Sequence, residues 1–196
     1  MRAFAPGKLV LTGAYAVLER APAIVVAVSR GAYADSSRTS SSPTPEVRAA
    51  LGVDRVPHVD ASAMFAGARK LGVGASAAIL VASLAAREAD AGADLADVAV
   101  RERLFTRARA AHARAQSGGS GVDVAASVYG GALRYVIDAP VRKVALPSGL
   151  VVRAFACAKS ARTSELREQI DRLATAHPRI HRSCMDALVA IANDAA

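Results

Sequence analysis

A glycine-rich segment that runs directly into an apolar helix constrains this chain more than any other feature of its sequence. Residues 70–78 read Lys-Leu-Gly-Val-Gly-Ala-Ser-Ala-Ala and lead into an apolar run at 79–86. Glycines let the backbone approach an oxyanion, which the first free N–H groups and the dipole of the helix attract. Ser76 adds a hydroxyl for a phosphate oxygen or a phosphate-bound magnesium ion. The segment predicts a phosphate-binding loop; a plain glycine turn before a buried helix is the alternative.

The composition predicts a cytoplasmic protein whose core is built from small side chains. Hydrophobic residues make up 53% of the 196, aromatic residues only 4%, and tryptophan is absent. The net charge of +8 suits an anionic substrate or a nucleic acid. We interpret the arginines at 101–114 as a solvated helix face and, without an RNA-binding pattern beside them, expect no nucleic-acid partner. No signal peptide or membrane-length apolar run is visible, and Cys157 and Cys184 are expected to be buried thiols.

Strands and helices follow one another without a regular repeat, which predicts an α+β fold. Asp97 is a suitable N-cap for the second long helix, and the Ser/Thr/Pro-rich residues 36–45 are expected to form a mobile loop or linker. The expected strands are 8–12, 23–28, 58–64 with a following turn, 132–137, 143–146 and a buried strand at 151–157. The expected helices are 47–51, 77–91, 98–116, 122–129, 163–176 and 183–193.

Two further segments supply groups that phosphoryl transfer needs. Lys8 leads a strand that ends in a glycine turn, and Asp123 follows a second glycine-rich loop at 117–121. A lysine can offset the charge of the transferred phosphoryl group, while a carboxylate orients or deprotonates the attacking oxygen. The alternatives are a surface lysine and an acid that complements a helix dipole. His112, between alanines on the second long helix, is expected to be a packed or surface residue.

The order of these motifs resembles that of the GHMP kinases, which carry a Pro-Gly-Lys strand, a Gly-Leu-Gly-Ser-Ser-Ala-Ala loop and a Ser-Gly-(Val/Phe)-Asp segment. Here they correspond to residues 6–8, 72–78 and 120–123. Within that family, Gly-Ala-Tyr-Ala-Val-Leu at 13–18 is similar to the first motif of fungal and plant phosphomevalonate kinases. The resemblance implies transfer of the γ-phosphoryl group of MgATP to 5-phosphomevalonate.

The resemblance also implies a domain division and a set of site residues. Residues 1–147 would form an ATP-binding domain related to ribosomal protein S5 domain 2, and 148–196 an incomplete ferredoxin-like domain. Lys8 and Asp123 would be catalytic, and Ser76 would contact the Mg²⁺ ion. The nucleotide would be bound by Lys70, Gly72, Val73, Gly74, Ala75, Ser76, Ala77 and Ala78. The small phosphorylated substrate would be bound by Tyr15, Ser120, Gly121, Lys159, Ser160, Arg162 and Thr163.

Several departures from the family pattern leave other functions open. Ala14 replaces a glutamate that can serve the metal, Ala75 replaces the first loop serine, and the third glycine-rich motif has no counterpart. A mevalonate kinase or another GHMP small-molecule kinase, a non-catalytic metabolite-binding protein and a basic S5-like nucleic-acid-binding domain are therefore the alternatives. We expect a monomer or a homodimer and no membrane association.

Overall fold

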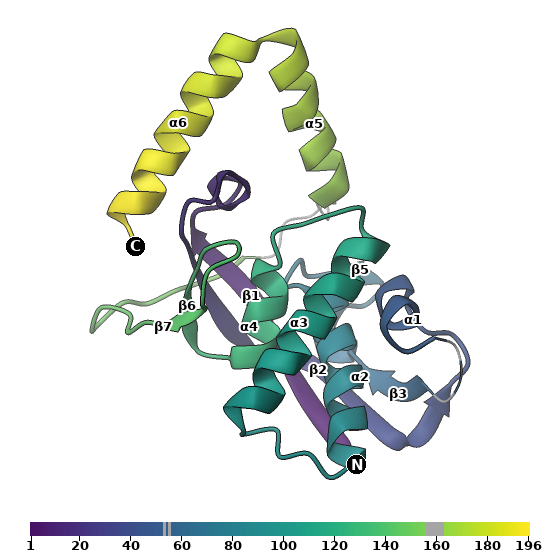
Figure 1. The fold of residues 1–196 in the computed structure, drawn as a ribbon. Helices are drawn as coiled ribbons and strands as arrows, with labels where there is room; N and C mark the ends of the chain where they lie inside the picture. Colours follow the sequence, from purple (N-terminus) through teal and green to yellow (C-terminus); the bar gives the residue numbers. More distant parts are fainter. Residues whose placement is uncertain (53, 55, 156–162) are drawn as a thin grey trace.

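A five-stranded antiparallel sheet organises the computed structural model, which describes residues 1–52, 54, 56–155 and 163–196 (Figure 1). Its longest strand is β2 (Ala23–Ser40), and β1 (Arg2–Thr12) pairs along one edge of it. On the other edge, β6 (Ala132–Tyr135) pairs with the first residues of β2, and β3 (Val56–Asp60) pairs with its last residues. Beyond β6 lies β7 (Arg142–Lys143). A separate hairpin joins β4 (Phe65–Ala66) to β5 (Arg69–Lys70).

The helices up to α4 (Val122–Tyr129) form layers over one face of this sheet, whereas the last two stand apart from it (Figure 1). Among the described residues the helices are α1 (Pro45–Leu51), α2 (Ala75–Asp90), α3 (Val98–Ala115), α4, α5 (Thr163–Ala176) and α6 (Pro178–Asp194), with the short 3₁₀ helices η1 (Ala16–Glu19) and η2 (Ser62–Met64). Both α2 and α4 pack on β1 and β2, and α3 packs on α1, α2 and α4. The α5–α6 hairpin extends away from these layers and returns so that α6 contacts η1 (Figure 1).

The core between sheet and helices is made of small side chains, as the scarcity of aromatic residues predicts. Ala5, Ala32 and Ala34 are fully buried on the face of the sheet that meets α2. The alternation of buried and exposed residues at the start of β1 follows from the two-residue period of a strand. Because alanines occupy the sheet face, α2 can lie close to it, and its Leu80 and Leu84 fill the remaining space without exposure.

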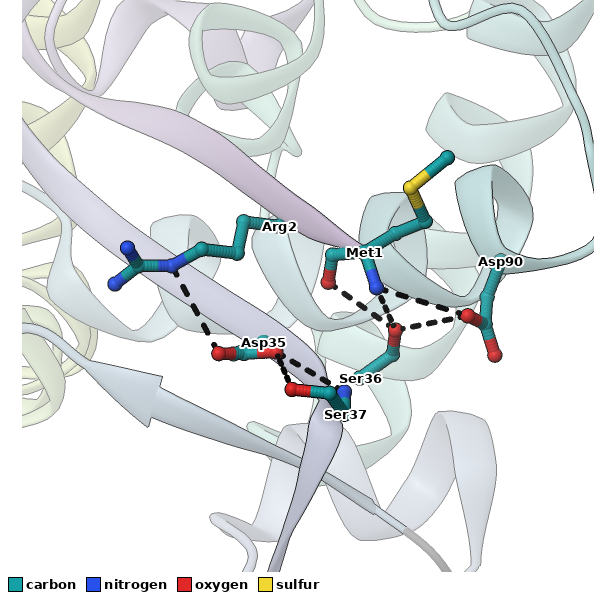
Figure 2. A network of polar contacts seen from close by, with 6 residues as sticks. All are labelled: Met1, Arg2, Asp35, Ser36, Ser37 and Asp90. Atoms are coloured by element: carbon teal, nitrogen blue, oxygen red, sulfur yellow. Dashed lines mark hydrogen bonds and ion pairs between the residues drawn. The ribbon is translucent and has the colours of Figure 1, made fainter.

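The prediction of a mobile loop at 36–45 is wrong for its first half, because β2 extends to Ser40 and its end pairs with β3. That pairing binds the backbone of the polar residues, so their low hydrophobicity does not decide the conformation. Figure 2 shows a polar network at this end of the sheet. The amino group of Met1 donates to Oγ of Ser36 at 2.7 Å, and that hydroxyl donates to Asp90 at the end of α2 at 3.1 Å.

Other expected elements differ from the structure near the C-terminal end. No strand is found at 151–155, where Val151 and Phe155 are exposed because no neighbouring strand lies beside them; residues 156–157 lie outside the described part. The strand expected at 143–146 is reduced to β7, and the last helix begins at Pro178, whose fixed φ suits a first helical turn. Cys184 is exposed, not buried, because it lies on a helix with few neighbours, and Cys157 lies outside the described residues.

The arginines of α3 are more than the solvated face that the sequence predicts. Arg107 and Arg114 donate to the carbonyl oxygens of Ala50 and Ala49, at 3.3 and 3.0 Å, near the end of α1. Cations at a helix C-terminus satisfy free carbonyls and complement the dipole. These two arginines therefore join α3 to α1. This structural role accounts for part of the positive charge of α3.

Asp97 caps α3 as predicted, since its carboxylate accepts the N–H of Ala99 at 2.7 Å. Replacing it, Asp97→Ala, removes this acceptor from the first turn. We expect the free energy of unfolding to fall by about 1 kcal/mol, measured by urea denaturation. Asp97→Asn, which keeps a capping oxygen, is the matched control and should lose much less. Equal losses in the two variants would contradict the capping role.

Candidate functional site: two glycine loops joined by a polar network

The phosphate-loop segment is held against β1 through the backbone. The N–H of Lys8 donates to the carbonyl oxygen of Val73 at 2.9 Å. A shift of register between Pro6 and Gly7 brings β1 to this position. A Cβ on Gly7 would lie 2.4 Å from the same carbonyl oxygen, so only glycine permits the close approach. The strand that carries Lys8 and the predicted phosphate loop are therefore one local structure.

The loop leaves the N-terminus of α2 free to bind an anion. Gly74 is the N-cap in the left-handed region, with φ of 80°, and no side chain caps the helix. The first N–H groups of α2 therefore lack the partner that a cap would give them. A Cβ on Gly72 would meet no atom within 4 Å, while the side chain of Lys8 runs alongside Gly74. The arrangement combines free N–H groups, a helix dipole and a lysine, as a phosphate site requires.

The second glycine loop is held in place from beneath by a buried tyrosine. The hydroxyl of Tyr135, on β6, donates to the carbonyl oxygen of Ser120, and its ring is almost completely buried. Burial raises the pKa of the Tyr135 hydroxyl, which therefore stays a hydrogen-bond donor at neutral pH. Gly121 then caps α4 with φ of 82°. From α4, Ser127 donates to the carbonyl oxygen of Pro6 at 2.8 Å, which ties this helix to the strand that carries Lys8.

A histidine joins the two loops. Nε2 of His112, on α3, lies 3.3 Å from Oγ of Ser76 and 3.5 Å from Oδ2 of Asp123. His112 is 5% exposed, whereas the Asp123 side chain is 21% exposed. The first turn of α2 and the first turn of α4 thus meet across one imidazole ring. The packing of α3 against both helices makes this contact possible.

A second chain of contacts reaches Ser76 from α1. Gln116, the C-cap of α3, donates from Nε2 to Oε1 of Glu46 at 2.9 Å and to Oγ of Ser76 at 3.2 Å. Glu46 is buried, which by itself would raise its pKa. Hydrogen bonds, of which that from Gln116 is the strongest, hold the pKa of this carboxyl below its ordinary value. Glu46 is therefore ionised at neutral pH.

The structure brings some of the predicted site residues together and leaves others apart. Lys8 lies at the first loop, and Ser76 and Asp123 share a neighbour. Ala77 and Ala78 are buried in α2 and can offer only backbone groups, while Lys70 is exposed on β5. Lys159, Ser160 and Arg162 lie outside the described residues, and Thr163 opens α5. The binding and catalytic roles of all these residues stay predictions.

Tyr15 stands at a strained turn just after β1. Its backbone has φ of 64° and ψ of −44°, which is unfavourable for a residue with a side chain. Strain of this kind persists only where the surroundings enforce it, and it is concentrated at functional sites. The strain is consistent with the predicted substrate-binding role of Tyr15.

Sequence reasoning missed three residues of the network: Glu46, His112 and Gln116. The sequence predicts His112 to be packed or on the surface; it is packed, but at the junction of the two loops. The signal available was spacing, since positions 112 and 116 are one helical turn apart and share a face of α3. Nothing in the sequence placed Glu46 opposite that face.

A divalent cation at this site would have few protein ligands. Within the described residues, no three or more His, Cys, Asp or Glu side chains are grouped as they would be around a metal ion. Magnesium in phosphoryl-transfer sites needs no such cage, because one or two carboxylates, water and the phosphates themselves hold it. The partly exposed carboxylate of Asp123 beside the phosphate loop fits that requirement.

Two hollows of the surface lie elsewhere. One of about 350 Å³ opens at the end of the sheet drawn in Figure 2. It is lined by Arg2, Tyr33, Asp35, Arg38, His58, Val59, Asp60 and Ala61. It shares no residue with either glycine loop, and its lining mixes basic and acidic groups without a free N-terminus of a helix. We therefore place the candidate site at the loops.

The buried hydroxyl of Tyr135 gives a direct test of how the second loop is held. Tyr135→Phe keeps the ring and leaves the carbonyl oxygen of Ser120 without this donor. We expect the free energy of unfolding to fall by about 1–2 kcal/mol, measured by chemical denaturation. Tyr33→Phe, at an exposed ring on β2, is the control and should change stability little. An unchanged stability of Tyr135→Phe would show that the bond contributes nothing.

Comparisons with known proteins bear on the fold and on the sequence as a whole. No family model matches the chain. The chain is similar to a mevalonate kinase of Archaeoglobus fulgidus, with 27% identity over 213 residues that cover 100% of this chain and 72% of that protein. Among solved structures it matches Methanococcus jannaschii mevalonate kinase with a TM-score of 0.67 and 12% identity, covering 100% of this chain and 72% of that one.

A further match is L. major mevalonate kinase in complex with R-mevalonate, with a TM-score of 0.61 and 18% identity, covering 100% of this chain and 68% of that one. These likenesses confirm the predicted α+β fold as that of the GHMP kinases. The relative from Archaeoglobus fulgidus is similar in sequence, whereas the two solved structures show likeness of fold alone. No described helix is both long and apolar enough to cross a lipid bilayer.

Proposed function

Because the chain has the GHMP kinase fold and its sequence is similar to that of a mevalonate kinase, we propose that it is an ATP-dependent small-molecule kinase. One observation supports this most directly. The uncapped N-terminus of α2 lies beside Lys8 and meets Asp123 through His112. Phosphoryl transfer needs donors for the phosphate oxygens, a positive charge and a carboxylate near the attacking oxygen. Lys8 lies beside Gly74 at the start of α2, and Asp123 reaches the same helix turn through His112.

Each group has a distinct part in the proposed reaction. The N–H groups of α2 bind the phosphates of ATP, and the ammonium group of Lys8 offsets the negative charge that donor and acceptor bring together. Asp123 would orient the acceptor oxygen and would be the carboxylate that holds a Mg²⁺ ion, which would neutralise charge on the phosphate oxygens. His112 and Tyr135, which contact the two loops, are themselves buried.

The acceptor we propose is 5-phosphomevalonate, with mevalonate as the second candidate. The motif around Tyr15 supports the first, and the strained turn there gives that residue a fixed position. The attacking oxygen of a phosphate is already ionised, so Asp123 would need only to orient it. The named relatives, which are mevalonate kinases, support the second.

ATP consumption with purified acceptors tests both candidates. We expect ADP to be formed with 5-phosphomevalonate and much less of it with mevalonate or homoserine at equal concentration. Faster turnover of mevalonate would assign the chain to that substrate. Nucleotide binding without turnover of any acceptor would favour a non-catalytic metabolite-binding protein, for which Ala14 and Ala75 are the supporting observations.

The remaining predictions go with this proposal. We propose an ATP-binding domain at 1–147 and a second domain to which 148–196 belong, acting as a monomer or homodimer in the cytoplasm. A basic nucleic-acid-binding domain is the alternative from another class. Salt-dependent binding of RNA or DNA tighter than about micromolar would favour it.

A further inference from the structure

The hydroxyl of Ser76 lies between two nitrogen atoms, and the chemistry of their neighbours decides what each one offers it. A hydroxyl has one proton to donate and two lone pairs with which to accept. Nε2 of Gln116 lies 3.2 Å from Oγ of Ser76, and Nε2 of His112 lies 3.3 Å from it. If both nitrogens carry hydrogens toward Oγ, both lone pairs are used.

Glu46 fixes the orientation of Gln116. An ionised carboxylate only accepts hydrogen bonds, so the amide group that lies 2.9 Å from Oε1 of Glu46 must be the NH₂ group. That group has two hydrogens, one for Glu46 and one for Ser76. The position of Glu46 on α1 therefore makes Gln116 a donor to Ser76.

Asp123 fixes the tautomer of His112 in the same way. Nε2 lies 3.5 Å from Oδ2 of Asp123 as well as 3.3 Å from Oγ of Ser76. A lone pair on Nε2 would face the carboxylate and repel it, so Nε2 carries the hydrogen. Ser76 then cannot donate its proton to His112, and the single hydrogen on Nε2 is shared between Oγ of Ser76 and Oδ2 of Asp123.

We propose that Gln116 and His112 are positioning residues that hold Ser76 as a hydrogen-bond donor to a nucleotide phosphate and leave no lone pair for a metal ion. The oxygen that this chain then offers to the cation is the carboxylate of Asp123. This deepens the proposed kinase function, on which it rests, and it differs from the metal contact of Ser76 that the sequence predicts. The proton of Ser76 is then left for an acceptor other than these two nitrogens.

Nucleotide affinity with and without magnesium tests the role of Ser76. Calorimetry would measure ADP binding to the whole chain and to Ser76→Ala, each in excess Mg²⁺ and in EDTA. A donor to phosphate is lost in both conditions, so we expect affinity to fall by about tenfold in each. Ser83→Ala is the matched control, because its hydroxyl bonds within α2, to the carbonyl oxygen of Ile79; its ADP affinity should equal that of the parent chain.

A loss confined to the magnesium condition would overturn the inference, since it is expected of a metal ligand. Recovery of Ser76→Cys in Mn²⁺ or Cd²⁺ but not Mg²⁺ would overturn it as well. If the parent chain binds no ADP in either condition, the proposed kinase function itself fails, and the inference fails with it. The two failures are thus distinguishable.

Variants of the positioning residues test the second half of the inference. Gln116 is exposed, so Gln116→Met removes the donor without opening a cavity in the core, although Glu46 also loses its hydrogen bond from Gln116. We expect it to raise the KM for ATP several-fold with a smaller change in kcat, and Ser76→Ala should then cost less in its background than alone. His112→Leu should also raise the KM for ATP several-fold. His112→Gln, which keeps an N–H donor, should have a KM for ATP close to that of the parent chain.

Purely additive effects of Gln116→Met and Ser76→Ala would overturn the positioning role. So would His112→Gln and His112→Leu variants with equal KM for ATP. Thermal melting of each variant identifies those that lose structure, and the exposed Gln116 keeps the test independent of the buried His112.

Discussion

Asp123→Asn is expected to lower kcat about a thousandfold while the fold stays intact. The amide keeps the shape of the side chain but removes the negative charge. In the proposed reaction that charge orients the acceptor oxygen and faces the cation. It also loses the charge opposite His112, whose Nε2 lies 3.5 Å from Oδ2. Because the side chain is 21% exposed, the substitution leaves no deeply buried charge unpaired. Steady-state rates of ADP formation measure the effect, and circular dichroism checks the fold.

Asp90→Asn is the matched control for this prediction. Asp90 ends α2, whose 16 residues separate it from the phosphate loop by about 24 Å. It contacts Met1 and Ser36 and no residue of the site (Figure 2). We expect its turnover to equal that of the parent chain. Asp123→Asn with more than about a tenth of the parent kcat would exclude Asp123 from the reacting centre.

Lys8→Met is expected to lower kcat/KM by about two orders of magnitude. Methionine keeps the length of the stem that lies along Gly74 and removes the positive charge. The backbone bond from residue 8 to Val73 is unaffected, so the loop should keep its shape. The loss should be larger for 5-phosphomevalonate than for an uncharged acceptor, because two anions repel more strongly than one anion and a neutral hydroxyl.

Lys143→Met is the control for the loss of one positive charge. Lys143 is exposed on β7, and its removal changes the net charge as Lys8→Met does. Rates measured at low and at high salt separate general attraction of an anionic substrate from a local effect. A similar loss in both variants would contradict a role for Lys8 at the reacting centre.

The fold could be predicted where local pattern and tertiary packing agree. The apolar run after Ser76 gives α2, Asp97 gives the start of α3, and glycine-rich residues separate α3 from α4, as the sequence predicts. The end of β2 could not be predicted, because residues 36–40 have no apolar alternation and the strand is held at Thr39 and Ser40 by pairing with β3. Conversely, the apolar residues near Val151 predict a strand, but they have no partner strand among the described residues.

The motifs of the candidate site could be predicted from the sequence, but the hydrogen-bond network that joins them could not. Lys8, Ser76 and Asp123 stand in segments whose glycines and chemistry can be read directly. Glu46 and Gln116 are 70 residues apart and neither belongs to such a segment. Their contact depends on the packing of α1 against α3, which two arginines of α3 help to fix by donating to carbonyl oxygens at the end of α1. Long-range packing of this kind leaves no signal in a single sequence.

The pairing of β2 with β6 has a consequence for how the site is assembled during folding. Ala23 faces Tyr135 across these strands. Closing the chain between these two residues costs more conformational entropy than forming the β1–β2 hairpin, because the intervening segment is much longer. The phosphate loop can thus form early, beside β1. The second glycine loop reaches its final conformation only after β6 has docked, because Tyr135 on that strand then donates to the carbonyl oxygen of Ser120. In this order of assembly, Asp123 is the last of the site residues to reach its position. A partly folded chain would therefore bind a nucleotide before it could transfer the phosphoryl group.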